Sequence, residues 1–336
     1  MKITSADRAE LLSILDRFSR QRMVLLGDLV ADEFIHGEIA RVSREAPVLI
    51  LKQREKQIVP GGGANAANNL AALGARVFPL GVVGDDESGD ALLQCLEERS
   101  ISTRHILRLR DHVTPTKSRV LGGLSHWQRQ QIVRVDREPA PLDRGIRRRL
   151  TEKAASLLPR SSGVLVSDYG YGSTSASDVA RLRGRRGRPS LPITIDSRFD
   201  LLTYSGVTAA TPNEPEVEQA FNRTIGASQK LLHELGRKLL RRMGLEALLV
   251  TRGRDGMVLF EPRHAPHHLA VFGSDQAVDV TGAGDTVIAT FTLALAAGAS
   301  FLRAAQLANC AGGLVVMKRG TATVTARELK EALRNA

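Results

Sequence analysis

Residues 279–290 read DVTGAGDTVIAT, with Asp279 and Asp285 on either side of the small run Thr281-Gly282-Ala283-Gly284. The apolar segment 287–297 follows at once and predicts a buried helix that begins at the glycines. The backbone N–H groups of Gly282, Ala283 and Gly284 would then face an anion at the helix N-terminus. A carboxylate beside such an anion hole suits phosphoryl transfer, with Asp285 accepting the proton of the attacking hydroxyl.

From the residues alone, two interpretations of Asp285 stay open. A helix N-terminus stabilises an ionised carboxylate, so the sequence predicts a weak base, and a loose phosphoryl-transfer transition state needs little early deprotonation. The alternative is an ordinary acidic residue of a first helical turn, favoured there by the helix dipole.

The composition is that of an ordinary globular protein. The 336 residues are 43% hydrophobic and 25% charged, and no apolar run reaches the roughly 18 residues that a membrane helix needs. The N-terminus is charged throughout, unlike a signal peptide, and Cys95 and Cys310 make no disulfide framework. We therefore expect a cytoplasmic protein that does not bind a membrane.

The net charge of +11 admits two explanations. Basic charge can serve nucleic-acid binding, but the densest tract, RLRGRRGRP at 181–189, has no aromatic residue for base stacking. Charge spread over the surface is the simpler interpretation, and it also suits phosphorylated metabolites. We expect a small-molecule partner rather than nucleic acid.

Short apolar runs alternate along the chain with amphipathic helical patterns. Such alternation predicts an α/β fold, with a mainly parallel central sheet and helices on both faces. Two regions, 33–59 and 115–135, instead alternate polar and apolar residues, so we expect antiparallel strands inserted as a small β-sheet lid. No linker divides the chain, and residues 1–336 are expected to form one domain. Strands are predicted at 22–28, 75–84, 163–168, 192–196, 206–213 and 247–253, and helices at 63–73, 87–99, 144–158, 175–183, 214–220 and 227–243.

A second glycine-rich turn opens a helix at PGGGANAANNL, residues 60–70. Its three glycines would let the backbone approach a ligand closely, and Asn65 and Asn69 lie on one helical face. A tight turn followed by polar surface asparagines is the alternative.

Motifs of other nucleotide-binding and catalytic classes are missing from the sequence. It contains no G-x-x-x-x-G-K-[ST] loop, no G-x-G-x-x-G after the first strand and no H-R-D or D-F-G set. The spacing of cysteines and histidines indicates no zinc site.

Four segments resemble the ribokinase (PfkB) family of sugar kinases: PGGGAN at 60–65, TPNEPEVE at 211–218, LLVTRGRDG at 248–256 and DVTGAGDT at 279–286. The similarity covers nearly the whole chain, and the last segment is specific to the family. Within the family, RVSREAPVLIL, TKSRVL, SDYGYG and ANCAGGLVVMKRGTATVT resemble the bacterial D-glycero-β-D-manno-heptose-7-phosphate kinases. The resemblance implies a ribokinase-like fold and the use of ATP and Mg²⁺. The implied reaction is phosphorylation of the anomeric hydroxyl of heptose 7-phosphate, which supplies ADP-heptose for lipopolysaccharide.

The resemblance also implies roles for single residues. Asp285 matches the catalytic base, and Gly282, Ala283 and Gly284 match the anion hole. Asp279 and Thr281 would belong to a monovalent-cation site for K⁺. The nucleotide-side matches are Asn213 and Glu216 for Mg²⁺ and the phosphates, Thr251 and Gly253 for the turn near the phosphates, and Asn309 for the adenine pocket. The sugar-side matches are Asp32, Gly62, Gly63, Asn65, Lys117, Arg119, Asp168 and Arg198.

These residues also have plain structural alternatives. Asn213 and Glu216 suit a helix N-cap and its third residue, and the three sugar-side cations could be solvated surface charges. Lys117 and Arg119 point the same way if they lie in a strand. The functional interpretation therefore groups both with Arg198 at the phosphate of the sugar, a sugar's length from Asp285.

The chain departs from the heptose kinases at two places. IDSRFD carries Arg198 where Pro-Lys is usual, and the lid segment LGGLSHWQRQQIV, with Trp127, is longer and richer in glycine. Another ribokinase-family carbohydrate or nucleoside kinase is therefore the alternative, and a catalytically silent nucleotide-binding or nucleic-acid-binding protein is a second one. We expect a homodimer through the lid. Because no nucleotidyl motif follows before Ala336, we also expect a kinase without an adenylyltransferase domain.

Overall fold

The computed structural model describes residues 4–123, 130–183, 191–274 and 276–335. Trp127 and most of the basic tract at 181–189 lie outside these ranges. None of the helices in the described part of the chain is long and apolar enough to cross a bilayer.

The core of the fold is an eight-stranded sheet in the order β14-β13-β12-β11-β10-β9-β1-β4. Every neighbouring pair from β12 to β4 in this order runs parallel. Only the β12–β13 and β13–β14 pairs are antiparallel. The prediction of a mainly parallel central sheet is confirmed. Its strands are β1 (Arg22–Gly27), β4 (Arg76–Leu80), β9 (Gly163–Asp168), β10 (Ile193–Ser197), β11 (Ala209–Ala210), β12 (Ala247–Thr251), β13 (Met257–Phe260) and β14 (His267–Leu269).

Helices cover both faces of this sheet, because alternate strand residues point to opposite sides. In β1, Met23 and Leu25 join one buried cluster, whereas Val24 and Leu26 join the other. The first cluster includes residues of α1 (Ser5–Asp16), α2 (Gly63–Ala72), α3 (Glu87–Glu98), α8 (Ala283–Ala296), α9 (Phe301–Val315) and α10 (Ala326–Asn335). The second includes residues of α4 (Arg144–Leu157), α5 (Ala176–Leu182), α6 (Glu214–Phe221) and α7 (Gln229–Met243).

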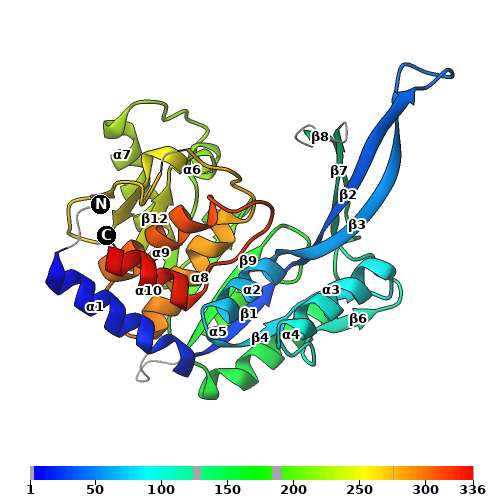
Figure 1. The fold of residues 1–336 in the computed structure, drawn as a ribbon. Helices are drawn as coiled ribbons and strands as arrows, with labels where there is room; N and C mark the ends of the chain where they lie inside the picture. Colours follow the sequence, from blue (N-terminus) through cyan, green and yellow to red (C-terminus); the bar gives the residue numbers. More distant parts are fainter. Residues whose placement is uncertain (1–3, 124–129, 184–190, 275, 336) are drawn as a thin grey trace.

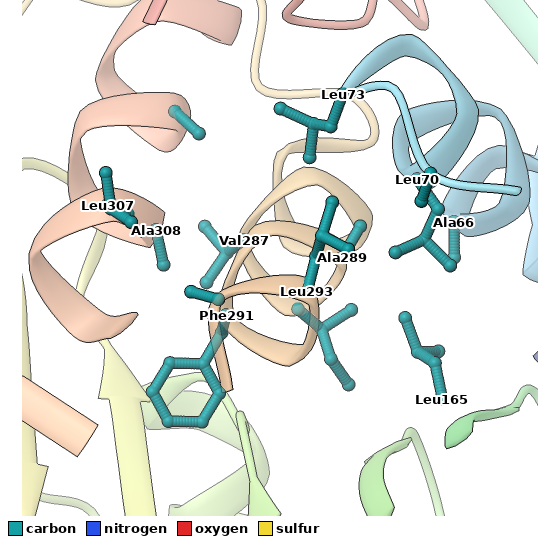
Figure 2. Packing of buried hydrophobic residues seen from close by; sticks show 14 of the residues in the cluster. Ala66, Leu70, Leu73, Leu165, Val287, Ala289, Phe291, Leu293, Leu307 and Ala308 are labelled. Atoms are coloured by element: carbon teal, nitrogen blue, oxygen red, sulfur yellow. The ribbon is translucent and has the colours of Figure 1, made fainter. Parts of the chain in front are cut away.

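Helix α8 is held between α2 and α9, so its N-terminus has a fixed position. Figure 2 shows Val287, Ala289 and Leu293 of α8 among side chains of α2, α9 and strand β9. A helix enclosed in this way must be apolar all round, which explains the unbroken apolar segment that follows Asp285.

A second, four-stranded sheet forms the lid, in the order β3-β2-β7-β8, and it extends away from the body of the molecule (Figure 1). Its pairs β2–β3 and β7–β8 are antiparallel, but β2–β7 is parallel, so the expectation of antiparallel strands throughout was wrong. The chain leaves the body along β2, returns along β3 and leaves again in the same direction along β7. The strands are β2 (Leu29–Val42), β3 (Leu49–Gly62), β7 (Thr116–Gly123) and β8 (Gln130–Arg137).

The segment predicted as one strand at 75–84 is divided. Residues 76–80 form β4, whereas β5 (Val82–Gly84) pairs with β6 (Leu107–Leu109) in a separate two-stranded sheet. The break falls at Gly81, where a Cβ would lie 2.5 Å from the carbonyl oxygen of Gly27. This close approach needs a glycine and turns the chain out of the main sheet.

Candidate active site

Polar residues gather where the parallel strands end. Asp28 follows β1, Asp168 ends β9, Asp196 lies in β10, Asn213 follows β11 and Thr251 ends β12. The carboxyl ends of parallel strands meet at one edge of a sheet, which is where ligands bind in open α/β folds. The N-terminus of α8 lies at the same edge, since Gly282 and Gly284 share a cavity with Asp168, Asn213 and Thr251.

The predicted anion hole lies at the first turn of α8. Gly282 is the N-cap in the left-handed conformation, with a φ of 75°, and a Cβ there would lie 2.6 Å from the side-chain nitrogen of Asn65. At Gly284 a Cβ would meet no heavy atom of the described residues within 4 Å. Gly282 therefore makes the turn, whereas Gly284 leaves space in front of the helix N-terminus.

Asp285 is only 4% exposed and is held by two donors from distant parts of the chain. Its carboxylate accepts a hydrogen bond from Asn65 Nδ2 at 2.8 Å and one from the Tyr169 hydroxyl at 3.1 Å. Burial raises the pKa of Asp285 to about 7, although these two hydrogen bonds lower it. The expected weak base was wrong, because loss of water outweighs the two hydrogen bonds and the charge of Lys117, all of which lower the pKa of Asp285. A carboxylate with a pKa near 7 suits proton abstraction at neutral pH.

The asparagines of the second glycine-rich turn connect α2 to α8. Asn69 Nδ2 donates to Asn65 Oδ1 at 3.2 Å, and Thr286 Oγ1 donates to Asn69 Oδ1 at 2.8 Å. Asn65, Asn69 and Thr286 are fully buried, so the alternative of polar surface asparagines is wrong. The connected side chains fix the amide that contacts Asp285.

The strand-end cavity, about 340 Å³, lies on one side of the α8 N-terminus. Asn213 and Glu216 line it and also form a capping box for α6, through hydrogen bonds of 2.9 and 2.8 Å. Burial raises the pKa of Glu216, and burial together with the charge of Glu216 raises the pKa of Asp196 well above its ordinary range. Two neighbouring buried carboxylates, one of which raises the pKa of the other, suit a bound cation. Thr251 and Arg198 also line this strand-end cavity.

An apolar slot of about 380 Å³ adjoins that cavity, with Gly284 and Thr251 lining both. Gly253 and Asn309 lie in the slot, together with apolar residues such as Val287. Asn309 donates from its amide to the carbonyl of Ala270 at 2.7 Å. The slot has the size and lining for a flat aromatic base.

The lid cavity, about 1060 Å³, lies between the lid strands and the loops that flank α8 and α9. Arg119 lines it and pairs with the buried Asp32 at 2.8 Å. Gly62 and Gly63 lie where the lid meets the body: Gly62 has a φ of 52°, and the Gly63 N–H donates to the carbonyl of Asp28 at 2.9 Å. Thr281 also lines the cavity.

Asp279 holds the two loops below the lid cavity together. Its carboxylate accepts hydrogen bonds from the backbone N–H groups of Thr281 and Gly320, both at 2.9 Å. Burial acts to raise the pKa of Asp279, but these hydrogen bonds lower it overall. Asp279 is therefore ionised and fixes the turn ahead of the anion hole.

The three cations predicted at the phosphate of the sugar lie near one another but face different parts of the site. Lys117 is buried over the ring of Tyr169, 4.8 Å from its centre, and burial and the charge of Arg198 lower its pKa. Arg198 lines the strand-end cavity with Asn213, whereas Arg119 lines the lid cavity. Arg198 and Arg119 thus line two different cavities, and their joint contact with one sugar phosphate stays a prediction.

Asp168 lines the strand-end cavity, but its carboxylate is engaged by the protein. It accepts hydrogen bonds from Ser197 at 2.9 Å, from Tyr204 at 2.8 Å and from the N–H of Gly170 at 3.0 Å. These contacts position the segment after β9 and leave Asp168 little capacity for a substrate.

Sequence reasoning missed several residues of the site. Asp28 accepts hydrogen bonds of 2.9, 3.0 and 2.9 Å from the N–H groups of Tyr169, Tyr171 and Ser173, which fixes the loop that carries Tyr169. Asp196 was also missed. An aspartate directly after or near the end of a buried strand was the available signal for both.

The sequence profile of the pfkB family carbohydrate kinases matches residues 27–138 and 180–327. The bifunctional protein HldE of Coxiella burnetii (strain Dugway 5J108-111) is 40% identical over 320 residues, 94% of this chain and 64% of that protein. HldE of Chromohalobacter salexigens is 41% identical over 317 residues, 93% of this chain and 63% of the relative. The chain thus spans just under two thirds of the length of these relatives.

Two solved structures share the fold at lower sequence identity. Arabidopsis thaliana ribokinase complexed with ribose and ATP superposes with a TM-score of 0.71 at 19% identity, covering 94% of this chain and 99% of the ribokinase. Escherichia coli phosphofructokinase-2 in complex with potassium gives 0.73 at 16% identity, covering 94% and 98%. The fold is therefore ribokinase-like, as predicted. The profile match and the 40% identity show that the chain belongs to the pfkB family of carbohydrate kinases.

Proposed function

We propose that the protein transfers the γ-phosphoryl group of ATP to the anomeric hydroxyl of D-glycero-D-manno-heptose 7-phosphate. The products would be the 1,7-bisphosphate and ADP, in the cytoplasmic synthesis of ADP-heptose. One observation carries the proposal: Asp285, with a pKa of about 7, follows an open anion hole in a carbohydrate-kinase fold. The similarity to HldE proteins supports the heptose as substrate.

In the proposed mechanism, the sugar hydroxyl lies against Asp285, between the lid cavity and the strand-end cavity. Its oxygen attacks the γ-phosphorus, the bond to the ADP oxygen breaks, and the hydroxyl proton passes to Asp285. Backbone N–H groups at Gly282, Ala283 and Gly284 would stabilise the charge on the transferred group. Lys117 contributes a buried positive charge near Asp285.

The nucleotide side fits ATP and Mg²⁺. The slot beside Gly253 and Asn309 suits adenine, and it opens at Gly284 into the strand-end cavity, which suits the phosphates. Glu216 and Asp196 carry the carboxylates that would hold Mg²⁺ through its water shell. When bound, Mg²⁺ neutralises phosphate charge, and Arg198 on the same cavity wall acts in the same sense.

The sugar side fits a polar, carbohydrate-sized ligand. Asp32, held by Arg119, lies against Gly61, where a Cβ would lie 2.7 Å from its carboxyl group. The proposed sugar contacts are therefore Asp32, Gly62, Gly63 and Asn65. A K⁺ ion near Asp279 and Thr281 is a further part of the proposal, and activity in K⁺ compared with tetramethylammonium tests it.

We also propose a homodimer through the lid. Val42, Val133 and Val135 leave apolar side chains on the lid sheet that are 59%, 47% and 58% exposed. Burying them against a second lid would stabilise a dimer. Val133→Glu should therefore shift the mass measured by light scattering from dimer to monomer. A monomeric wild-type protein would contradict this part.

The function is tested by ADP release with a panel of acceptors at fixed ATP. The panel contains heptose 7-phosphate, heptose, hexose 6-phosphates, ribose and nucleosides. We expect the highest kcat/KM with heptose 7-phosphate, and ³¹P NMR should show a phosphate at the anomeric carbon. A higher kcat/KM with another acceptor would establish a different substrate in this family. No ADP release with any acceptor would refute a kinase.

A further inference from the structure

The lid cavity contains cationic and polar groups that the proposed mechanism does not use. His36 reaches it from β2, and Arg319 and Thr321 reach it from the loop after α9, on the body side. His36 and Arg319 therefore lie on opposite walls of one cavity of about 1060 Å³.

Two of these groups have buried polar atoms without partners. His36 Nδ1 and Thr321 Oγ1 are inaccessible to water and make no hydrogen bond within the described part of the chain. An unsatisfied buried polar atom is costly in a folded protein, and rotation of either side chain would turn this atom toward a ligand in the cavity. Arg319 is exposed and lines this cavity. Arg119, the other arginine of this cavity, already pairs with Asp32.

Along the lid, His36 lies farther from the body of the molecule than Asp32 does. Asp32, Phe34 and His36 are alternate residues of β2, so their side chains lie on one face of the strand. His36 is therefore about 13 Å along the strand from Asp32, at about 3.3 Å per residue. A sugar held at Asp32 would extend its far end toward His36, and Arg319 lines the other wall of the same cavity.

We propose that Arg319 and His36 bind the phosphate at the far end of the sugar, with Thr321 beside them. This inference rests on the proposed function and replaces the grouping of Lys117, Arg119 and Arg198. A phosphate dianion needs a cation to compensate for the loss of water, and an arginine provides paired donors for its oxygens. Arg319 and His36 are thus the residues that select a phosphorylated sugar over its unphosphorylated counterpart.

The test compares Arg319→Ala and His36→Leu with wild type on heptose 7-phosphate and on heptose. For Arg319→Ala we expect kcat/KM for heptose 7-phosphate to fall by roughly 10- to 150-fold, as for loss of a charge-assisted hydrogen bond. The values for heptose and for ATP should stay within about twofold, since only the phosphate contact is lost. His36→Leu should lower the same preference, and His36→Asn should restore part of it by returning an amide near Nδ1.

The matched control is Arg242→Ala, which removes an exposed arginine of α7 that lines none of the three cavities described above. It should leave both sugars unaffected. If wild type prefers heptose 7-phosphate and Arg319→Ala keeps that preference, the inference fails and the proposed function stands. A higher KM for ATP alone would place Arg319 at the nucleotide and also overturn it. If wild type shows no preference for the phosphorylated sugar, both proposals fail.

Discussion

Replacing Asp285 by asparagine should separate catalysis from stability. Asp285→Asn keeps the shape of the side chain but removes its charge and its ability to accept a proton. The Tyr169 hydroxyl can rotate to accept from the new amide, while Asn65 continues to donate, so the two contacts of 3.1 and 2.8 Å can be kept. Turnover should fall by about 10²–10⁴-fold, the usual effect of losing a positioned general base.

The same change should stabilise the fold above neutral pH. The pKa of Asp285 is raised from 3.8 to about 7, so the folded state disfavours the carboxylate. This pKa is higher in the folded than in the unfolded chain. The contribution of Asp285 to the free energy of unfolding is therefore fully present below about pH 4 and is lost as the pH rises to about 7. Three pH units correspond to roughly 4 kcal/mol as an upper limit. We expect Asp285→Asn to raise the free energy of unfolding by about 1–4 kcal/mol at pH 8.

Urea unfolding of both proteins at pH 8 and at pH 4 measures this effect. The gain should be present at pH 8 and nearly absent at pH 4, where Asp285 is protonated in the folded state. Asp279→Asn is the matched control with the opposite sign. The pKa of Asp279 is lowered by the N–H groups of Thr281 and Gly320, so its replacement should destabilise the protein at pH 8. A gain for Asp285→Asn that is equal at both pH values would refute the reasoning, and near-normal turnover would refute the base.

Three further substitutions test the site. Gly284→Val should leave the melting temperature unchanged, because a Cβ there meets no described atom within 4 Å. Turnover should nevertheless fall at least about 10²-fold, because the side chain fills the proposed phosphate position. Normal turnover would place the phosphate elsewhere. Gly282→Ala should lower the free energy of unfolding, measured with urea, by roughly 1–2 kcal/mol or more, since the φ of Gly282 is 75° and the new Cβ would lie 2.6 Å from Asn65 Nδ2. An unchanged urea midpoint would contradict this. Tyr169→Phe removes a donor that lowers the pKa of Asp285, so the acidic limb of the kcat/KM profile should move up by about one pH unit. A limb that stays in place would show that this hydrogen bond does not affect the base.

Local patterns in the sequence were sufficient for the fold class. The continuous apolar strands, the helical periods between them and the glycine turn at 282–284 depend on neighbours a few residues apart. For the same reason the start of α8 and the capping box at Asn213 and Glu216 could be predicted. The resemblance to the family then supplied most of the candidate site residues.

The tertiary structure decided the properties that depend on distant partners. Asp285 contacts Asn65 and Tyr169, which are 220 and 116 residues away, and its burial in the folded protein raises its pKa. The distribution of Lys117, Arg119 and Arg198 over different walls follows from where the lid and β10 lie relative to the sheet edge. The parallel β2–β7 pair likewise depends on the path of the chain between the two strands. Loss of water and charge–charge interaction depend on the atoms that surround a group in space, and sequence spacing does not contain that arrangement.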